Sequence, residues 1–252
     1  MLLKISLVLA GVAIALYVAA AGYLYANQRS MLYYPTGETR PATPGFKIIR
    51  VPTTEGLSLV AGYRPAAPGK HTFVAFHGNA ADWQSMAASL APLADKGFGV
   101  LSVEYRGYRG NPGTPTEHGF YEDGRAAVRW LIAAGTAEGD IIAVGNSIGS
   151  GVAVQLAVEH IFKAVVLVSP VSSITRLASA RVSWLPVSLL LTDRFDNAAK
   201  LGRIAEPVLI LHGDADLVVP FAEAKFLSAQ NREAVFKAYP GAGHDLMYQP
   251  AI

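Results

Sequence analysis

The sequence contains no cysteine, and this absence excludes several kinds of function at once. Without thiols the chain forms no disulfide scaffold, holds no thiolate metal site and uses no cysteine nucleophile. Charge is also scarce, because only 16% of the residues are charged and the formal net charge is +2. Since no block of Lys and Arg accompanies so small an excess, we expect no nucleic-acid partner.

Charge is absent from one long stretch, Ile5–Ala26, which is 22 residues in length. A helix of roughly 20 apolar residues crosses a bilayer, so the stretch predicts a transmembrane anchor over residues 1–26. Tyr17, Tyr23 and Tyr25 lie toward its C-terminal end, and amphipathic rings favour the headgroup zone. We therefore expect a membrane protein with a single N-terminal anchor.

A cleaved signal peptide is the alternative for residues 1–26, because Lys4 provides a basic start and Ala19–Ala21 provide small residues for a peptidase. The apolar stretch is longer than the usual signal core of about 7 to 15 residues, which favours the anchor. Lys4 on one side nearly balances Arg29 and Arg40 on the other. The sequence thus leaves the side of the membrane open.

The rest of the chain has the length and hydrophobic content of one α/β domain, which we expect over residues 46–252. Residues 27–45 are interrupted by Pro and Gly and show little periodicity, which predicts a tether. Phe46–Val51 and Leu57–Tyr63 predict a β-hairpin with Gly56 in its turn. The domain is therefore expected to begin with this hairpin.

Short apolar runs then alternate with segments of helical periodicity. Six further strands are expected, at Thr72–Phe76, Phe98–Val103, Ile141–Val144, Ala164–Val168, Pro207–Leu211 and Ala234–Tyr239. This alternation predicts a mainly parallel central sheet flanked by helices. Residues 169–205 interrupt it with a long apolar connection, which predicts a small cap over the site, an extra packed helix, or both.

A candidate nucleophile stands in Gly145-Asn146-Ser147-Ile148-Gly149, between an expected strand and a helical pattern. The form is G-x-S-x-G, in which a serine on a sharp strand-to-helix turn is exposed for attack. Gly145 and Gly149 supply the space that the close backbone of such a turn requires. Ser147 is therefore the expected nucleophile.

A serine nucleophile needs a histidine base and a carboxylate that orients the base. His244 is the candidate base, because it lies five residues beyond the last expected strand in a glycine-rich loop. The other five histidines have ordinary surface or loop-supporting interpretations. Asp214 and Asp216 both follow the strand Pro207–Leu211, and spacing alone does not choose between them.

Acyl transfer also needs two hydrogen-bond donors for the developing oxyanion. The backbone N–H of Ile148, directly after the nucleophile, is one expected donor. The backbone N–H of Asn79 is the other, because Asn79 lies in the loop after the strand Thr72–Phe76, where Gly78 permits a close backbone approach.

Five motifs stand in order along the chain: His77-Gly78-Asn79-Ala80, Tyr105-Arg106-Gly107-Tyr108, Gly145-Asn146-Ser147-Ile148-Gly149, His212-Gly213-Asp214-Ala215-Asp216 and Gly243-His244-Asp245. With the order Ser, Asp, His they resemble the α/β-hydrolase superfamily, most of all its membrane-anchored branch of protein depalmitoylases and lysophospholipid or monoacylglycerol lipases. The resemblance implies an α/β-hydrolase fold and a serine hydrolase without metal or organic cofactor. It places the carboxylate at Asp216, and with the anchor it favours a lipid or small-molecule acyl substrate or an acylated protein.

The family usually continues past the catalytic histidine into a closing helix, whereas eight residues follow His244 here. A nucleotide-binding loop also fits Gly145, Gly149 and Gly151, but it belongs at the first βα turn with an acidic residue about 20 positions on. An aminopeptidase-like amide hydrolase would use the same triad, and a membrane-anchored binding module would keep the fold without turnover.

Overall fold

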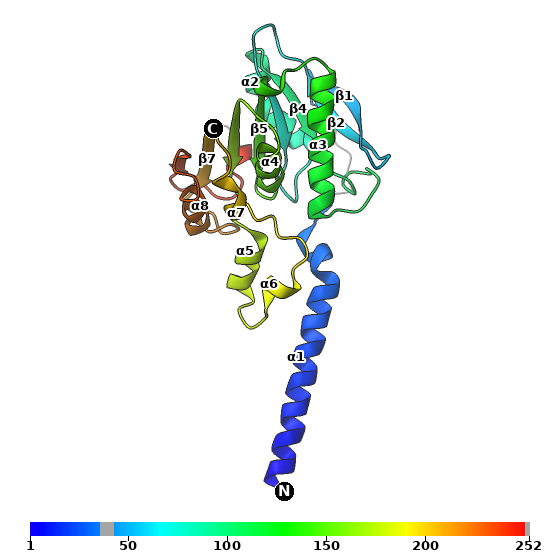
Figure 1. The fold of residues 1–252 in the computed structure, drawn as a ribbon, viewed down its shortest axis with the longest axis vertical. Helices are drawn as coiled ribbons and strands as arrows, with labels where there is room; N and C mark the ends of the chain where they lie inside the picture. Colours follow the sequence, from blue (N-terminus) through cyan, green and yellow to red (C-terminus); the bar gives the residue numbers. More distant parts are fainter. Residues whose placement is uncertain (36–42, 250–252) are drawn as a thin grey trace.

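The computed structural model describes residues 1–35 and 43–249. Their central sheet has the strand order β1-β2-β4-β3-β5-β6-β7-β8 (Figure 1). The strands are β1 (Lys47–Pro52), β2 (Ser58–Arg64), β3 (Thr72–Phe76), β4 (Gly99–Val103), β5 (Ile141–Asn146), β6 (Ala164–Val168), β7 (Val208–Gly213) and β8 (Val235–Tyr239). β1 and β2 form the expected antiparallel hairpin, and β3 to β8 are parallel to one another.

Helices cover both faces of the sheet. They are α2 (Trp83–Asp95), α3 (Glu117–Ala133), α4 (Gly149–Ala157), α5 (Ile174–Arg181), α6 (Val187–Leu190), α7 (Ala198–Leu201) and α8 (Phe221–Ser228), with short turns at Glu138–Asp140 and Leu246–Tyr248. Side chains alternate along a strand, so Val74 and Phe76 pack into one core with α3 and α4, while Phe73 and Ala75 pack into the other with α2. This arrangement confirms the α/β-hydrolase fold expected from the sequence.

The N-terminal helix α1 (Leu2–Leu32) projects from the domain as a long rod (Figure 1). By length and composition it is able to cross a membrane. It continues past Ala26, so residues 27–32 are helical, which differs from the tether expected there. No proline or glycine interrupts this part of the chain, and the helix ends before Tyr34, the residue that precedes Pro35.

The end of α1 is fixed to the domain by an aromatic side chain. Tyr33 is only 4% exposed, and its ring lies 5.2 Å from Phe120 and 6.5 Å from Phe195, measured between ring centroids. The expected tether is therefore attached to the domain where the helix ends. The rest of that prediction, residues 36–42, lies outside the described residues.

The long connection between β6 and β7 contains α5, α6 and α7. α5 and α6 lie beside the C-terminal part of α1 (Figure 1), and Gln28 of α1 is hydrogen bonded to Leu190 and Thr192 at the end of α6. α7 instead packs with α4 and α8. Within residues 169–205, α6 thus contacts α1, and α7 packs on the domain. We call the segment with α5 and α6 the cap.

Candidate active site

Ser147 lies at a sharp turn between β5 and α4. Its φ is +52°, a left-handed conformation that non-glycine residues adopt only where the surrounding structure holds them. A Cβ on Gly145 would lie 2.5 Å from the Ser150 Cα, and one on Gly149 would lie 2.2 Å from the carbonyl oxygen of Phe76. Only glycine fits at both positions, so the two glycines allow the turn that exposes Ser147.

His244 joins Ser147 to Asp216. Its Nε2 lies 2.9 Å from the Ser147 Oγ, and its Nδ1 lies 2.7 Å from the Asp216 Oδ2. His244 stands in the loop after β8 and Asp216 in the loop after β7, and these strands are neighbours in the sheet. His244 therefore lies within hydrogen-bond distance of both of the other side chains predicted from the sequence.

The carboxylate of Asp216 is held as an anion. Its Oδ1 accepts hydrogen bonds from the backbone N–H groups of Val218 and Val219, each at 2.8 Å. Burial raises the pKa of Asp216, but hydrogen bonds from His244 and the Val219 N–H outweigh it, and the net pKa lies below the ordinary value. An ionised Asp216 keeps a proton on the Nδ1 of His244 and leaves Nε2 free to accept one.

Asp214, the other candidate carboxylate, points elsewhere. Its Oδ1 accepts a hydrogen bond of 2.7 Å from the backbone N–H of Gly241, which braces the loop that carries His244. Of the two aspartates, Asp216 is the one that contacts His244.

The two expected oxyanion donors belong to Ile148, which follows Ser147 in the chain, and to Asn79, which follows Gly78. Gly78 approaches the nucleophile closely, since a Cβ added to it would lie 3.0 Å from the Asn146 Nδ2 and 3.3 Å from the Ser147 Cβ. Within residues 1–35 and 43–249, the backbone N–H groups of Asn79 and Ile148 form no hydrogen bond. Both remain available for a ligand oxygen near Ser147.

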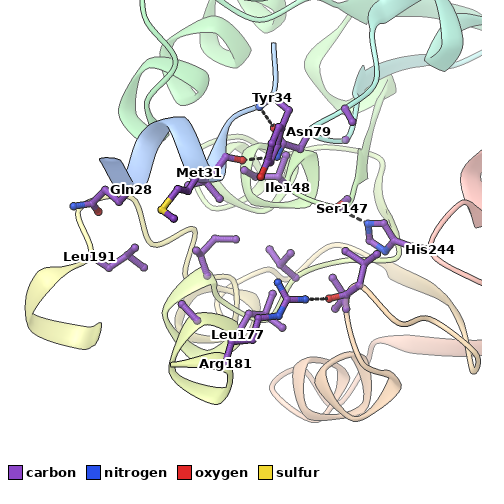
Figure 2. Close-up of a pocket in the computed structure, with 18 of the residues that line it drawn as sticks. Gln28, Met31, Tyr34, Asn79, Ser147, Ile148, Leu177, Arg181, Leu191 and His244 are labelled. Atoms are coloured by element: carbon purple, nitrogen blue, oxygen red, sulfur yellow. Dashed lines mark hydrogen bonds between the residues drawn. The ribbon is translucent and has the colours of Figure 1, made fainter. Parts of the chain in front are cut away.

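The side chain of Asn79 ties this loop to the end of α1 (Figure 2). Its Oδ1 accepts a hydrogen bond from the Tyr34 backbone N–H at 2.9 Å. The same oxygen accepts a second bond, at 2.6 Å, from the hydroxyl of Tyr108. Its Nδ2 donates to the carbonyl oxygen of Leu32. No local pattern in the sequence predicts these contacts, because Asn79 lies 45 or more positions from Leu32 and Tyr34.

The remaining histidines have structural partners. His77 is buried, and its Nε2 lies 2.9 Å from Glu104. The Nε2 of His212 lies 3.0 Å from the carbonyl oxygen of Val219, and burial lowers the pKa of this imidazole. His71, His118 and His160 pair at the surface with Asp140, Glu122 and Glu138. In the described part of the chain, no group of three or more His, Cys, Asp or Glu side chains is suited to hold a metal.

A cavity of about 840 Å³ opens over Ser147 and His244 (Figure 2). Its walls are mostly apolar, and they come from the domain, from the cap and from α1. The cap contributes Leu177, Leu185, Val187, Leu190 and Leu191, and α1 contributes Leu24, Tyr25, Gln28, Met31 and Leu32. The sequence did not predict that α1 would form one wall of the site.

The comparisons with known proteins agree with the fold. Residues 73–196 match the profile of the alpha/beta hydrolase family. The human alpha/beta hydrolase domain-containing protein 17B is 32% identical over 199 residues, which cover 77% of this chain and 67% of the relative. The chain belongs to the α/β-hydrolase family. An uncharacterised protein of Mycobacterium tuberculosis is 35% identical over 232 residues, covering 88% of this α/β-hydrolase and 82% of the relative.

Solved structures share the fold of this α/β-hydrolase. An esterase from Pyrococcus furiosus superimposes with a TM-score of 0.68 at 19% identity, covering 86% of this chain and 91% of its own. The enzyme Est1E of Butyrivibrio proteoclasticus, determined with ferulic acid bound, gives a TM-score of 0.66 at 20% identity, with coverages of 81% and 92%. At 19% and 20% identity, the similarity to these two structures shows the fold alone.

Proposed function

We propose that this α/β-hydrolase is a serine hydrolase that cleaves acyl esters or thioesters. The observation that carries the proposal is the position of His244, whose two ring nitrogens lie 2.9 Å from the Ser147 Oγ and 2.7 Å from the Asp216 carboxylate. An imidazole held between a hydroxyl and a carboxylate is the arrangement that activates a serine nucleophile.

The reaction begins when the Ser147 Oγ attacks the acyl carbonyl carbon and gives its proton to the Nε2 of His244. The resulting oxyanion accepts hydrogen bonds from the N–H groups of Asn79 and Ile148. The bond to the leaving oxygen or sulfur breaks, the leaving group takes the proton from His244, and an acyl-enzyme remains on Ser147. One water, deprotonated by His244, then releases the acid and restores Ser147. These steps use side chains and backbone N–H groups of this chain together with one water, and none of them calls for a metal or cofactor.

A lipid-like acyl group is the substrate that suits this site. The apolar walls of the cavity favour a hydrocarbon chain over a charged or sugar group. α1 serves as the membrane anchor and forms one of these walls, so the site lies close to the acyl chains of the bilayer. The carrier of the acyl group is a small molecule, a lipid or an acylated protein.

Labelling of the full-length protein with a fluorophosphonate tests the role of Ser147. We expect labelling of the wild type, its complete loss in Ser147→Ala, and its retention in Ser188→Ala, a change at an exposed serine of the cap. An unlabelled wild type, or a labelled Ser147→Ala protein, would overturn the proposal. In parallel, p-nitrophenyl acyl esters should be cleaved faster than amino-acid anilides, and the reverse preference would indicate an amide hydrolase.

A further inference from the structure

A second, smaller groove lies between α1 and the cap. Its volume is about 330 Å³, and its walls are Tyr17, Val18, Ala21, Gly22 and Tyr25 of α1 with Leu190 of α6. Tyr25 and Leu190 also line the cavity above Ser147. The groove and the cavity therefore adjoin at these two side chains, and together they lead from the catalytic serine to the apolar part of α1.

One face of α1 forms the floor of this path. The groove residues of α1 recur at intervals of three to four positions, so they share one side of the helix. The same side continues through Gln28 and Leu32, which line the cavity. From Ala21 to Leu32 the helix rises roughly 16 Å, a length that suits a long acyl chain and exceeds what an acetyl or butyryl group requires.

Small residues keep the groove open. Ala21 and Gly22 lie side by side on its floor, and a Cβ added to Gly22 would have no heavy atom within 4 Å. Glycine costs about 1 kcal/mol relative to alanine in a helix interior, and the free space around Gly22 shows that packing in the domain does not require it. A larger side chain at this position would project into the groove.

Gln28, a polar residue along the path, has the hydrogen bonds of its side-chain amide satisfied. The Nε2 of Gln28 donates to the carbonyl oxygens of Tyr25 and Leu190, at 2.9 and 3.3 Å. Its Oε1 accepts from the backbone N–H of Thr192 at 2.8 Å. Since the amide is paired with protein groups, it does not oppose the passage of hydrocarbon.

We propose that the long acyl chain of the substrate lies in this groove, with its terminal part remaining in the lipid leaflet. The substrate thus reaches Ser147 from the side, between α1 and α6. The inference rests on the proposed function and adds a substrate class to it, namely long-chain acyl groups held in a bilayer. The continuity of the groove with the cavity, and its far end on the apolar stretch that includes Tyr17 and Val18, identify the acyl chain as the occupant. The alcohol or thiol that carries the chain lies beyond Ser147, outside the groove.

Two matched substitutions in α1 test this route in full-length protein reconstituted in phosphatidylcholine vesicles. Gly22→Phe fills the groove, whereas Gly11→Phe makes the same change on the same helix at a glycine that lines neither cavity and also has no heavy atom within 4 Å of an added Cβ. The readout is kcat/KM for p-nitrophenyl palmitate carried in the vesicles, divided by kcat/KM for p-nitrophenyl butyrate added from solution.

We expect Gly22→Phe to lower this ratio by about tenfold or more, the range in which apolar pockets discriminate chain length, and Gly11→Phe to leave it unchanged. Ala21→Leu, a milder obstruction of the same floor, should lower the ratio to a smaller extent. Gly22→Phe should also depress cleavage of whichever palmitoyl carrier the wild type accepts, a lysophospholipid or a palmitoyl-cysteine peptide.

An unchanged ratio in Gly22→Phe would overturn the route. So would an equal loss of both activities, the result expected if the groove holds a permanently bound lipid that supports the fold. Failure of the proposed function is distinguishable from these outcomes, because the wild type would then cleave neither ester through Ser147.

Discussion

Asp214 and Asp216 stand two positions apart but contact different parts of the site. Asp216 bonds to the imidazole of His244, and Asp214 bonds to the backbone of Gly241. Asp216→Asn removes the charge that stabilises the protonated imidazole, so we expect kcat for an acyl ester to fall by about 10² to 10⁴-fold. Asp214→Asn keeps an oxygen for the Gly241 N–H and should leave kcat unchanged. Steady-state kinetics measure both, and equal losses in the two variants would contradict these roles.

Because the imidazole of His212 is buried, we expect the free energy of unfolding to decrease in mild acid. Burial lowers the pKa of its imidazole, so the folded protein holds it neutral while the unfolded chain takes up a proton below about pH 6.5. The free energy of unfolding therefore decreases as the pH falls below this value, by up to about 1.4 kcal/mol per pH unit, until the folded imidazole also titrates. His212→Gln removes this proton uptake and keeps a donor for the Val219 carbonyl.

Thermal unfolding of the wild type and His212→Gln near pH 7 and near pH 5 checks this prediction. The wild type should lose more stability than the variant over the interval. Parallel losses would show that His212 does not contribute to the acid sensitivity.

The site side chains could be predicted because each follows a strand in a recognisable motif. The G-x-S-x-G spacing predicts Ser147 as the nucleophile, and the position of His244 after the last expected strand predicts it as the base. Spacing left Asp214 and Asp216 open, and the resemblance to the α/β-hydrolases favoured Asp216. The side-chain contacts of Asn79 could not be predicted, because they depend on how α1 docks, and this docking leaves no local pattern in the sequence.

At the scale of elements, Asn79 connects α1 to the loop that carries one oxyanion donor. Asn79→Ala leaves the backbone N–H in place but removes three hydrogen bonds that hold it, to Leu32, Tyr34 and Tyr108. A loop released in this way misplaces the donor, and we expect kcat for p-nitrophenyl butyrate to fall by about tenfold or more with little change in KM. Asn79 is thus a positioning residue.

Tyr108→Phe is the graded comparison, because it removes one of the three bonds and should lower kcat less. The pH profile of kcat should stay the same in both variants, since His244 and Asp216 are unaltered. An unchanged kcat in Asn79→Ala would contradict the link between α1 and the loop.

The central strands were predictable because they are short apolar runs, and β3 and β4 are buried along their whole length. The C-terminal end of α1 was not predictable, because residues 27–32 are polar enough to suit either a tether or the last turns of a helix. Docking of Tyr33 on the domain fixes that boundary, and tertiary contacts of this kind are not visible in a local pattern.

At the scale of the whole molecule, α1 and the cap form one unit beside the domain (Figure 1). The ring of Tyr17 lies 5.8 Å from that of Trp184 at the tip of the cap, and Arg29 forms an ion pair of 2.8 Å with Asp193. A helix of 31 residues is about 46 Å long, more than the roughly 30 Å hydrocarbon core, so its C-terminal turns extend beside the cap. With α1 as the membrane anchor, we expect the cap tip to contact the membrane.

Fluorescence quenching tests that placement. In vesicles of phospholipid with brominated acyl chains, Trp184 should be quenched relative to unbrominated vesicles, because its side chain is half exposed next to α1. Trp83 is buried and Trp130 packs on Tyr63, so Trp184→Phe should remove most of the quenching. Quenching that persists in Trp184→Phe would place the cap away from the lipid.

One α/β domain preceded by a long apolar helix could be predicted from the apolar stretch and the spacing of the strands. It could not be predicted that α1 and the cap both line the active-site cavity. Leu24, Gln28 and Met31 reach this cavity only because of the angle at which α1 meets the domain. That angle is set by contacts such as Gln28 with Thr192 and Arg29 with Asp193, which join residues more than 160 positions apart.

The central claim is that hydrolysis proceeds through an acyl group on Ser147. The most direct test is mass spectrometry of the full-length protein, quenched with acid during turnover of p-nitrophenyl palmitate. The account predicts a mass increase of one palmitoyl group, mapped to the peptide that contains Ser147 and absent in Ser147→Ala. Turnover without an acylated protein, or a palmitoyl group on another residue, would contradict it.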